Sequence, residues 1–245
     1  MDHAIVESNK KNWEQAAERF FGRNPLPEYG PLAPTEEELN LLGSVSGKRV
    51  LDIGCGSGHS LSYMQRKGAS ELWGIDVSSA QIRAAKSVLN KSDAKLFQSP
   101  MEQNPGLPAH YFDIVYSIYA LGWTTNLALT LKNVHTYLKP GGSFVFSWEH
   151  PWFTLLRKNE NGYLLQGSYH DEGFYNHPGW PITAFMQQLK VSTYVNTLSE
   201  QGFHVEQVIE ETGDGFGQKK SKTWYTEEKA ALIPTTLIIK STKAK

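Results

Sequence analysis

Short apolar runs alternate with helical patterns through the middle of the chain. Five runs rich in Val, Ile, Leu and Phe predict strands, and the segments between them carry apolar residues at helical spacing. The predicted strands are Arg49–Ile53, Glu71–Asp76, Lys95–Gln98, Phe112–Ser117 and Ser143–Trp148. The predicted helices lie near 59–67, 79–90 and 126–137. Alternating strands and helices are typical of a parallel sheet covered on both faces, so we expect a doubly wound α/β fold.

The two ends of the chain add further elements to this pattern. Before the first strand, the apolar spacing around Trp13 and Phe20 predicts a helix over 8–22, and Thr35 with Glu38 forms a capping box that begins another. After the fifth strand we expect a helix over 191–201 and strands over 203–210 and 235–241, completing a mostly parallel, seven-stranded sheet. We interpret the chain as one domain with an N-terminal helical cap (1–44), a core (45–148), an insertion (149–190) and C-terminal elements (191–245).

Composition narrows the class of protein. A net charge of -1 gives no general attraction to nucleic acid or to an anionic membrane, and we expect neither as a partner. No apolar run reaches the roughly 20 residues that span a bilayer. The single cysteine, Cys55, cannot form an internal disulfide, and the first residues lack the pattern of a signal peptide. We therefore expect a cytoplasmic protein.

The most informative stretch is V-L-D-I-G-C-G-S-G-H at 50–59. An apolar strand runs into three glycines at alternate positions, Gly54, Gly56 and Gly58, directly before a predicted helix. Glycine lets a ligand approach bare backbone, and a helix start offers free N–H groups. Ligands of open parallel sheets bind beyond the carboxyl ends of the strands, which is where this loop lies. The loop therefore predicts a site for a nucleotide-like cofactor.

Asp76 ends the next strand, where an acid can accept hydrogen bonds from both hydroxyls of a ribose. NAD-binding folds also place an acid at the end of this strand, so this spacing alone does not identify the cofactor. The dinucleotide fingerprint needs a third glycine where this chain has His59, and Gly58 comes one residue early. The glycine pattern therefore disfavours a nicotinamide cofactor.

Four blocks together carry a resemblance to a known family. D-I-G-C-G-S-G (52–58), G-I-D-V-S (74–78), F-D-I-V-Y-S (112–117) and L-K-P-G-G-S-F-V-F-S (138–147) resemble, in order and spacing, the blocks of class I S-adenosylmethionine-dependent methyltransferases. The group that the chain resembles includes small-molecule enzymes of the ubiquinone and menaquinone biosynthesis type. The resemblance implies the fold of that family, S-adenosylmethionine as cofactor and methyl transfer as activity.

The resemblance also implies roles for individual residues. The three glycines would line the methionine and ribose parts of the cofactor, Asp52 would orient the loop, and Ser117 would lie beside the methionine part. Asp76 would hold the ribose. Val77, Ser99 and Met101 would contact adenine, with Ser99 standing where many relatives have an acid. No cluster of residues suggests a metal site.

The segment after the fifth strand is dense in aromatic side chains, and the family places its variable substrate region there. We expect Tyr119, Trp123 and Trp148 to face the acceptor, with His150 and His170 as candidate bases. Two alternatives remain open: the aromatic residues form a small core of their own, or they form a homodimer contact. The N-terminal helix is either a core element or a lid over the cofactor.

The acceptor class follows by elimination. The chain has neither the N-P-P-Y or D-P-P-Y signature of amino-methylating DNA enzymes nor the Pro-Cys nucleophile of cytosine methylases. We therefore expect a small-molecule acceptor and direct displacement of the methyl group. A noncatalytic protein that binds S-adenosylmethionine is the first alternative, and an NAD(P)-dependent oxidoreductase is the second.

Overall fold

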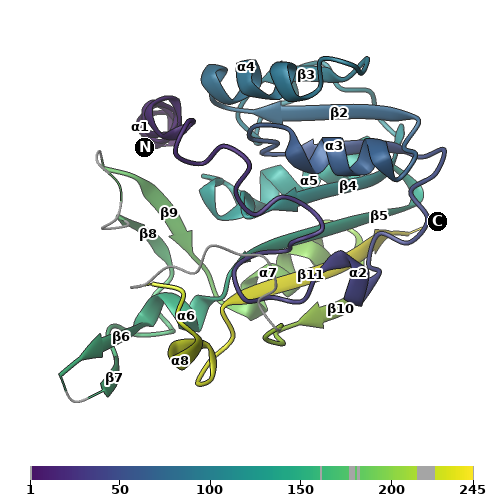
Figure 1. Cartoon of the computed structure of the whole chain (residues 1–245). Coiled ribbons are helices and arrows are strands. Elements are labelled where there is room, and N and C mark those ends of the chain that lie inside the picture. Colours follow the sequence, from purple (N-terminus) through teal and green to yellow (C-terminus); the bar gives the residue numbers. More distant parts are fainter. Residues whose placement is uncertain (1, 161, 177–179, 181–182, 214–223, 245) are drawn as a thin grey trace.

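A seven-stranded sheet crosses the centre of the computed structural model, which describes residues 2–160, 162–176, 180, 183–213 and 224–244 (Figure 1). The strand order is β10-β11-β5-β4-β1-β2-β3. The strands are β1 (Arg49–Ile53), β2 (Glu71–Asp76), β3 (Lys95–Gln98), β4 (Phe112–Ile118), β5 (Leu138–Glu149), β10 (Phe203–Ile209) and β11 (Thr236–Lys243). Only β11 runs against its neighbours in this sheet. The predicted doubly wound fold with seven mostly parallel strands is confirmed.

Helices cover both faces of the sheet, and the pleat of the strands supplies each face with its own core. The helices are α1 (Asp2–Ala16), α2 (Glu36–Leu39), α3 (His59–Arg66), α4 (Ser79–Val88), α5 (Leu127–Tyr137) and α7 (Val191–Glu200). On β1, Leu51 and Ile53 pack in the core that contains α5 and α7, whereas Val50 packs in the core that contains α3. Successive side chains of a strand point to opposite faces, so both cores draw on the same apolar runs.

The strand bounds follow the sequence closely, with one exception. β1, β2 and β3 have the predicted bounds, because each apolar run ends abruptly at polar or glycine residues. β5 begins at Leu138, five residues before the predicted start. The L-K-P-G-G turn at 138–142 enters the sheet through an irregular register, in which Phe112 pairs with Leu138 and Ile114 already pairs with Ser143.

The N-terminal helix lies further toward the chain start than the apolar spacing predicts. α1 covers Asp2–Ala16 rather than 8–22, and Phe20 and Phe21 lie beyond its end. The side of α1 that packs on the molecule contains Asn9 and Asn12, which are buried but polar. Their amides bond to backbone near β9, so the helix docks through hydrogen bonds that a search for apolar periodicity overlooks.

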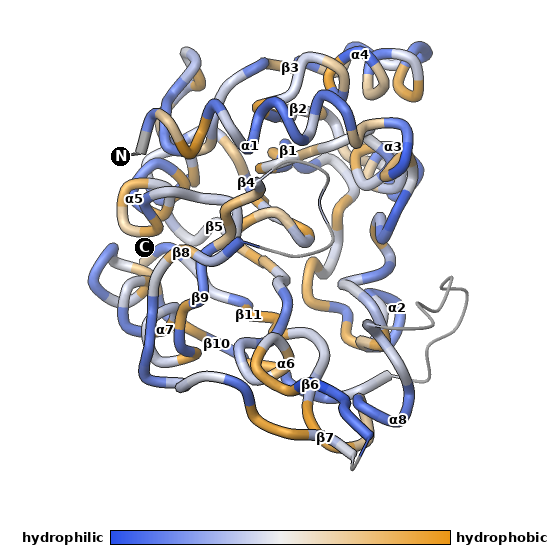
Figure 2. The backbone as a smooth tube through the Cα atoms, turned by 90° about the vertical axis from the view of Figure 1, so that its left-hand side faces the viewer, coloured by the Kyte–Doolittle hydropathy of each residue, from blue (hydrophilic) through white to orange (hydrophobic). Residues whose placement is uncertain are grey.

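The predicted insertion follows β5 and contains two hairpins. Its elements are α6 (Pro151–Leu155), β6 (Leu156–Asn159), β7 (Gly162–Leu165), β8 (Gly173–Asn176) and β9 (Phe185–Gln188). The β6–β7 hairpin projects from the body of the molecule (Figure 1), and Figure 2 shows a hydrophobic stretch on β7 at the outer edge. Near the end of the chain, α8 (Glu227–Ala230) packs beside the insertion.

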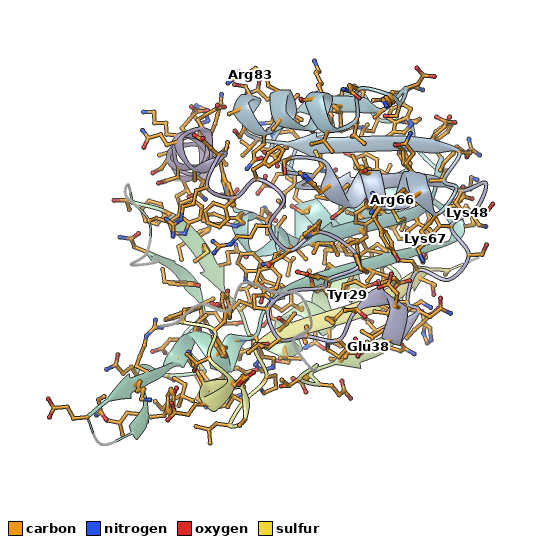
Figure 3. The ribbon with its side chains drawn as sticks, viewed as in Figure 1. Tyr29, Glu38, Lys48, Arg66, Lys67 and Arg83 are labelled. Atoms are coloured by element: carbon orange, nitrogen blue, oxygen red, sulfur yellow. The ribbon has the colours of Figure 1, made fainter. Side chains whose placement is uncertain are left out.

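The two ends of the parallel strands differ in their surroundings. α1, β8 and β9 lie beside the carboxyl ends of these strands, whereas Lys48, Arg66 and Lys67 lie at the opposite end (Figures 1 and 3). Lys48, Arg66 and Lys67 are therefore remote from the edge where an open α/β sheet binds its ligands, whereas Arg83 lies on α4 near α1. No helix in the described ranges is long and apolar enough to cross a membrane.

Candidate functional site

A cavity of about 580 Å³ lies at the carboxyl ends of the parallel strands. Its wall is built from the segments that follow β1, β2, β3, β4 and β5, and from the chain after α1. This wall brings together ten of the residues that the sequence predicts as cofactor or acceptor contacts. They are Asp52, Gly54, Gly56, Asp76, Val77, Ser99, Met101, Tyr119, Trp123 and Trp148.

The glycine loop presents bare backbone to this cavity. Gly54 and Gly56 have φ values of +76° and +49°, in the left-handed region that favours glycine. A Cβ atom on Gly54 would lie 2.3 Å from Ala120 Cβ, so the loop packs tightly against the segment after β4. At Gly56, among the residues that the structure describes, the only atom within 4 Å of such a Cβ would be Gln81 Oε1, at 3.9 Å. Gly56 therefore faces open space in the cavity.

Asp76 holds the glycine loop and the start of α4 together. Its Oδ2 accepts a hydrogen bond from the Gly56 N–H at 2.9 Å, and its Oδ1 accepts one from the Ser78 N–H at 2.9 Å. Burial raises the pKa of Asp76 to about 6, against the lowering effect of these two bonds. Asp52 lies in the same wall, and burial, reinforced by the charge of Asp76, raises the pKa of Asp52 well above its usual range.

The polar groups near Asp76 fit a nucleoside-like ligand. Gln81 is buried and lines the cavity, and its Oε1 has no hydrogen-bond partner among the described residues. A buried acceptor without a partner costs free energy, and a donor on a bound ligand would satisfy it. Val77, Ser99, Pro100 and Met101 continue the same wall. The donor and acceptor set thus suits the ribose and adenine of S-adenosylmethionine.

The segment after β4 supplies aromatic side chains to the other part of the cavity. Tyr119 has φ of +54°, an uncommon backbone conformation for a residue with a side chain, and its hydroxyl lies 2.8 Å from Thr236 Oγ1. Its ring lies 5.7 Å from that of Trp148. A Cβ on Gly122 would lie 1.9 Å from the Trp148 indole, so this packing requires glycine at 122.

Glu149 is a cavity residue that our sequence interpretation missed. It is the last residue of β5, it is buried, and it lines the cavity. Its Oε2 accepts hydrogen bonds from Trp224 Nε1 at 2.6 Å and from the Tyr225 hydroxyl at 2.7 Å. Burial raises the pKa of Glu149. The sequence does carry one signal, an acid at the carboxyl end of a central strand directly after Trp148.

Aromatic rings from distant segments meet over the cavity. The Trp13 ring lies 5.2 Å from Trp123 and 4.9 Å from Trp180, and Phe20 stacks on Trp180. The chain after α1 is fixed to the glycine loop, because the Gly22 N–H donates to Ser57 Oγ at 3.1 Å. All four rings line the cavity, so α1 and the insertion contribute to one wall.

Two residues predicted to contact the cofactor lie outside the cavity wall. A Cβ on Gly58 would lie 3.0 Å from Ala85 Cβ, so this glycine packs against α4 at the start of α3. The Ser117 hydroxyl is buried and donates to the Ile53 carbonyl at 2.8 Å, joining β4 to β1. Neither Gly58 nor Ser117 lines the cavity, and both residues support the elements that carry the glycine loop.

The two histidines predicted as bases also lie outside the wall. His150 is buried beside α6, with Nδ1 accepting from the Trp152 N–H at 3.2 Å and Nε2 lying 2.7 Å from Glu210 Oε1. His150 therefore caps α6, and its predicted catalytic role has no support from this placement. His170 is exposed in a turn beside Tyr169. Within the described residues, no group of three or more His, Cys, Asp or Glu side chains could hold a metal ion.

Comparisons with known proteins agree with this geometry. The model of the family described as "Methyltransferase domain" matches residues 11–208. An uncharacterised protein of Haemophilus influenzae is 28% identical over 225 residues, covering 86% of this chain and 87% of that protein. The ubiquinone biosynthesis O-methyltransferase of Acinetobacter baylyi is 30% identical over 162 residues, covering 63% of this chain and 61% of its own length.

A solved structure extends the comparison to the fold. The putative S-adenosylmethionine-dependent methyltransferase of Listeria monocytogenes has a TM-score of 0.72 and 27% identity, covering 86% of this chain and 97% of that one. The family model covers most of the chain, and the glycine loop with Asp76 and Gln81 suits the cofactor. The chain therefore belongs to the methyltransferase domain family and is an S-adenosylmethionine-dependent methyltransferase.

Proposed function

We propose that the enzyme methylates a small molecule by direct displacement. The observation that supports this most is the continuity of one cavity, about 580 Å³ in volume, from the glycine loop to the aromatic rings after β4 and β5. Volumes of this size are typical of sites for cofactors and small ligands. The rings of Trp13 and Trp180 contact each other in its wall, where they would pack on a small acceptor.

We also propose roles for the residues at the cofactor end. Gly54 and Gly56 would let the methionine and ribose parts approach the backbone, and Asp76 would accept hydrogen bonds from the ribose hydroxyls. Val77 and Met101 would pack on adenine, with Ser99 as the polar contact. Gln81 Oε1, which has no partner among the described residues, would accept a hydrogen bond from the ligand.

Bound S-adenosylmethionine supplies a methyl group on a positively charged sulfur, which is already electrophilic. The chain then has three tasks: to orient the acceptor, to exclude water and to manage the acceptor's proton. Tyr119, Trp123 and Trp148 would orient a flat acceptor, because these aromatic residues line the same part of the cavity. Holding two reactants in line is worth several orders of magnitude in rate.

The experiment is a methyl-transfer screen. The protein is incubated with S-adenosylmethionine labelled in its methyl group and with a fractionated extract of metabolites, proteins and nucleic acids. We expect label to appear in the low-molecular-weight fraction together with stoichiometric S-adenosylhomocysteine. Label confined to protein or nucleic acid would refute the small-molecule acceptor. Tight cofactor binding without turnover in any fraction would favour a noncatalytic cofactor-binding protein.

Two further points concern the cellular location and the oligomeric state of the enzyme. We propose a cytoplasmic location, since a sequence with one cysteine, Cys55, cannot form the internal disulfides that are typical of exported proteins. The homodimer stays a prediction. The β6–β7 hairpin exposes Leu164 and Leu165, so it is the candidate dimer contact within the insertion. A measurement of molecular mass in solution tests whether the dimer forms.

A further inference from the structure

Four carboxylates belong to the described wall of the cavity, and three of them lie at the glycine loop or cap the turn before α5. They are Asp52, Asp76, Glu102 and Glu149. Asp52 and Asp76 lie at the glycine loop. Glu102 caps the turn before α5, because its Oε1 accepts hydrogen bonds from the Thr124 hydroxyl at 2.8 Å and from the Thr125 backbone N–H. Glu149 is the carboxylate that remains, and it lies at the end of β5 among the aromatic rings.

Positive charges and hydrogen-bond donors around Glu149 favour its ionised form, while burial favours the neutral form and raises the pKa of Glu149 overall. The charges of Lys229 on α8 and Arg157 on β6 oppose the effect of burial, as do the hydrogen bonds from Trp224 and Tyr225. Among the described residues, the hydroxyls of Tyr119, Tyr175 and Tyr225 are further titratable groups that interact with it. Lys229 itself is buried, and its ammonium donates to the Phe153 carbonyl at 2.6 Å.

Aromatic side chains line the same cavity as this carboxylate. Tyr119 and Trp148 are tilted by 46° with their centroids 5.7 Å apart, and Trp123 stands edge-on to Trp148. The Glu149 bond to Trp224 places another indole beside the carboxylate. Rings in offset or edge contacts favour a planar aromatic partner, and a buried carboxylate favours a partner that donates a hydrogen bond.

We propose that Glu149 is a catalytic residue that binds the nucleophile of the acceptor and takes its proton, and that the acceptor is a planar aromatic molecule carrying a hydroxyl or an N–H group. This inference rests on the proposed function. The nucleophile's O–H or N–H bond gives its proton to a Glu149 oxygen, and a lone pair of that O or N forms the bond to the methyl carbon. The carbon–sulfur bond breaks with its electron pair on sulfur, and the proton later leaves Glu149 for solvent.

The first test uses three matched probes on the protein saturated with S-adenosylhomocysteine. The probes are 2-naphthol, 2-methylnaphthalene, which replaces the hydroxyl by a methyl group, and decahydro-2-naphthol, which keeps the hydroxyl and loses the flat ring. We expect 2-naphthol to bind at least about tenfold more tightly than either, measured by calorimetry, because a hydrogen bond to a buried charge and the ring contacts each contribute. Equal affinity of 2-naphthol and 2-methylnaphthalene would refute the role of Glu149.

The second test compares Glu149→Gln with Glu206→Gln, a matched change on β10 where Glu206 pairs with Lys240 at 3.1 Å. Both variants should keep wild-type affinity for S-adenosylhomocysteine, which also shows that they are folded. Glu149→Gln should lose the tenfold preference for 2-naphthol over 2-methylnaphthalene, and Glu206→Gln should keep it. If Glu149→Gln keeps the preference, the carboxylate only anchors Trp224 and Tyr225.

A pH profile separates proton transfer from positioning. The ionised form of Glu149 accepts the proton. With S-adenosylmethionine saturating at every pH, so that the ionisation of Asp76 does not limit binding, the rate of 2-naphthol methylation by the wild type should rise with pH as Glu149 ionises. This limb should be absent in Glu149→Gln, and the same limb in both proteins would exclude Glu149 as the base. Failure of the broader proposal looks different, because the extract screen would then yield no methylated small molecule whatever the probes and variants show.

Discussion

At the scale of single residues, Gly54 and Gly56 differ in what surrounds them. A side chain on Gly54 would overlap the protein itself, at Ala120, whereas a side chain on Gly56 would enter the cavity. Both have positive φ, so any substitution costs about 1–2 kcal/mol of backbone strain. One glycine is therefore needed mainly for packing and the other for the ligand.

Substitutions of the two glycines should separate these effects. We expect Gly56→Val to weaken S-adenosylmethionine binding more than about tenfold, since its side chain would occupy ligand space, with only the strain cost to stability. Gly54→Ala should lower the melting temperature by several degrees more, because overpacking adds about 1–3 kcal/mol. Calorimetry and thermal unfolding measure the two effects. Normal cofactor affinity in folded Gly56→Val would place the ligand elsewhere.

Asp76 offers a test by pH. Because burial raises its pKa to about 6, the carboxylate gains its charge as the pH rises through about 6. The ribose hydroxyls bind the ionised form, so affinity for S-adenosylhomocysteine should fall as the pH drops from 8 to 5. Asp76→Asn should weaken binding at pH 8 by about 1–3 kcal/mol and remove this pH dependence. Asp113→Asn, a matched change outside the cavity wall, should leave both the affinity and its pH dependence intact. An unchanged dissociation constant in Asp76→Asn would mean that Asp76 is only a helix cap.

At the scale of elements, α1 connects the cofactor core with the insertion. Glu14 accepts hydrogen bonds from the backbone N–H groups of Ser79, at 2.5 Å, and Ala80, at 3.0 Å, which are free donors at the start of α4. On the insertion side, the Asn9 side chain donates to the Phe185 carbonyl at 2.8 Å and accepts from its N–H at 2.9 Å. α1 thus holds Trp13 against Trp123 and Trp180.

Removal of the Glu14 carboxylate should loosen α1 without unfolding the sheet. We expect Glu14→Ala to cost about 0.5–2 kcal/mol of local stability, the usual contribution of a capping acceptor. The measurements are faster proteolysis within residues 1–25 and faster dissociation of S-adenosylhomocysteine. Glu18→Ala, a nearby exposed acid, serves as the control. Equal dissociation rates in the two variants would mean that α1 is a fixed wall of the cavity rather than a lid.

The elements also show what the sequence could and could not predict. β1 to β3 were predictable because each is a short, mainly apolar run that ends at glycine or polar residues, and the site residues at their ends follow from parallel topology. α1 was misplaced because its docking face uses asparagine amides. Contacts such as Trp224 with Glu149 join residues 75 positions apart, and local patterns carry no signal for such distant contacts.

At the scale of the whole molecule, the cavity wall is assembled from the chain after α1, the strand ends, the insertion and the segment before α8. A ligand that contacts all of these stabilises the folded state as a unit, by RT ln(1 + [L]/Kd). At a concentration of about 100 Kd this is about 2.7 kcal/mol, which for a protein of this size raises the melting temperature by about 5–10 °C. We expect this shift with S-adenosylmethionine and S-adenosylhomocysteine, growing with the logarithm of concentration. NAD should give none, because His59 occupies the position of the third glycine of its fingerprint, and equal stabilisation by NAD would overturn the assignment of the glycine loop.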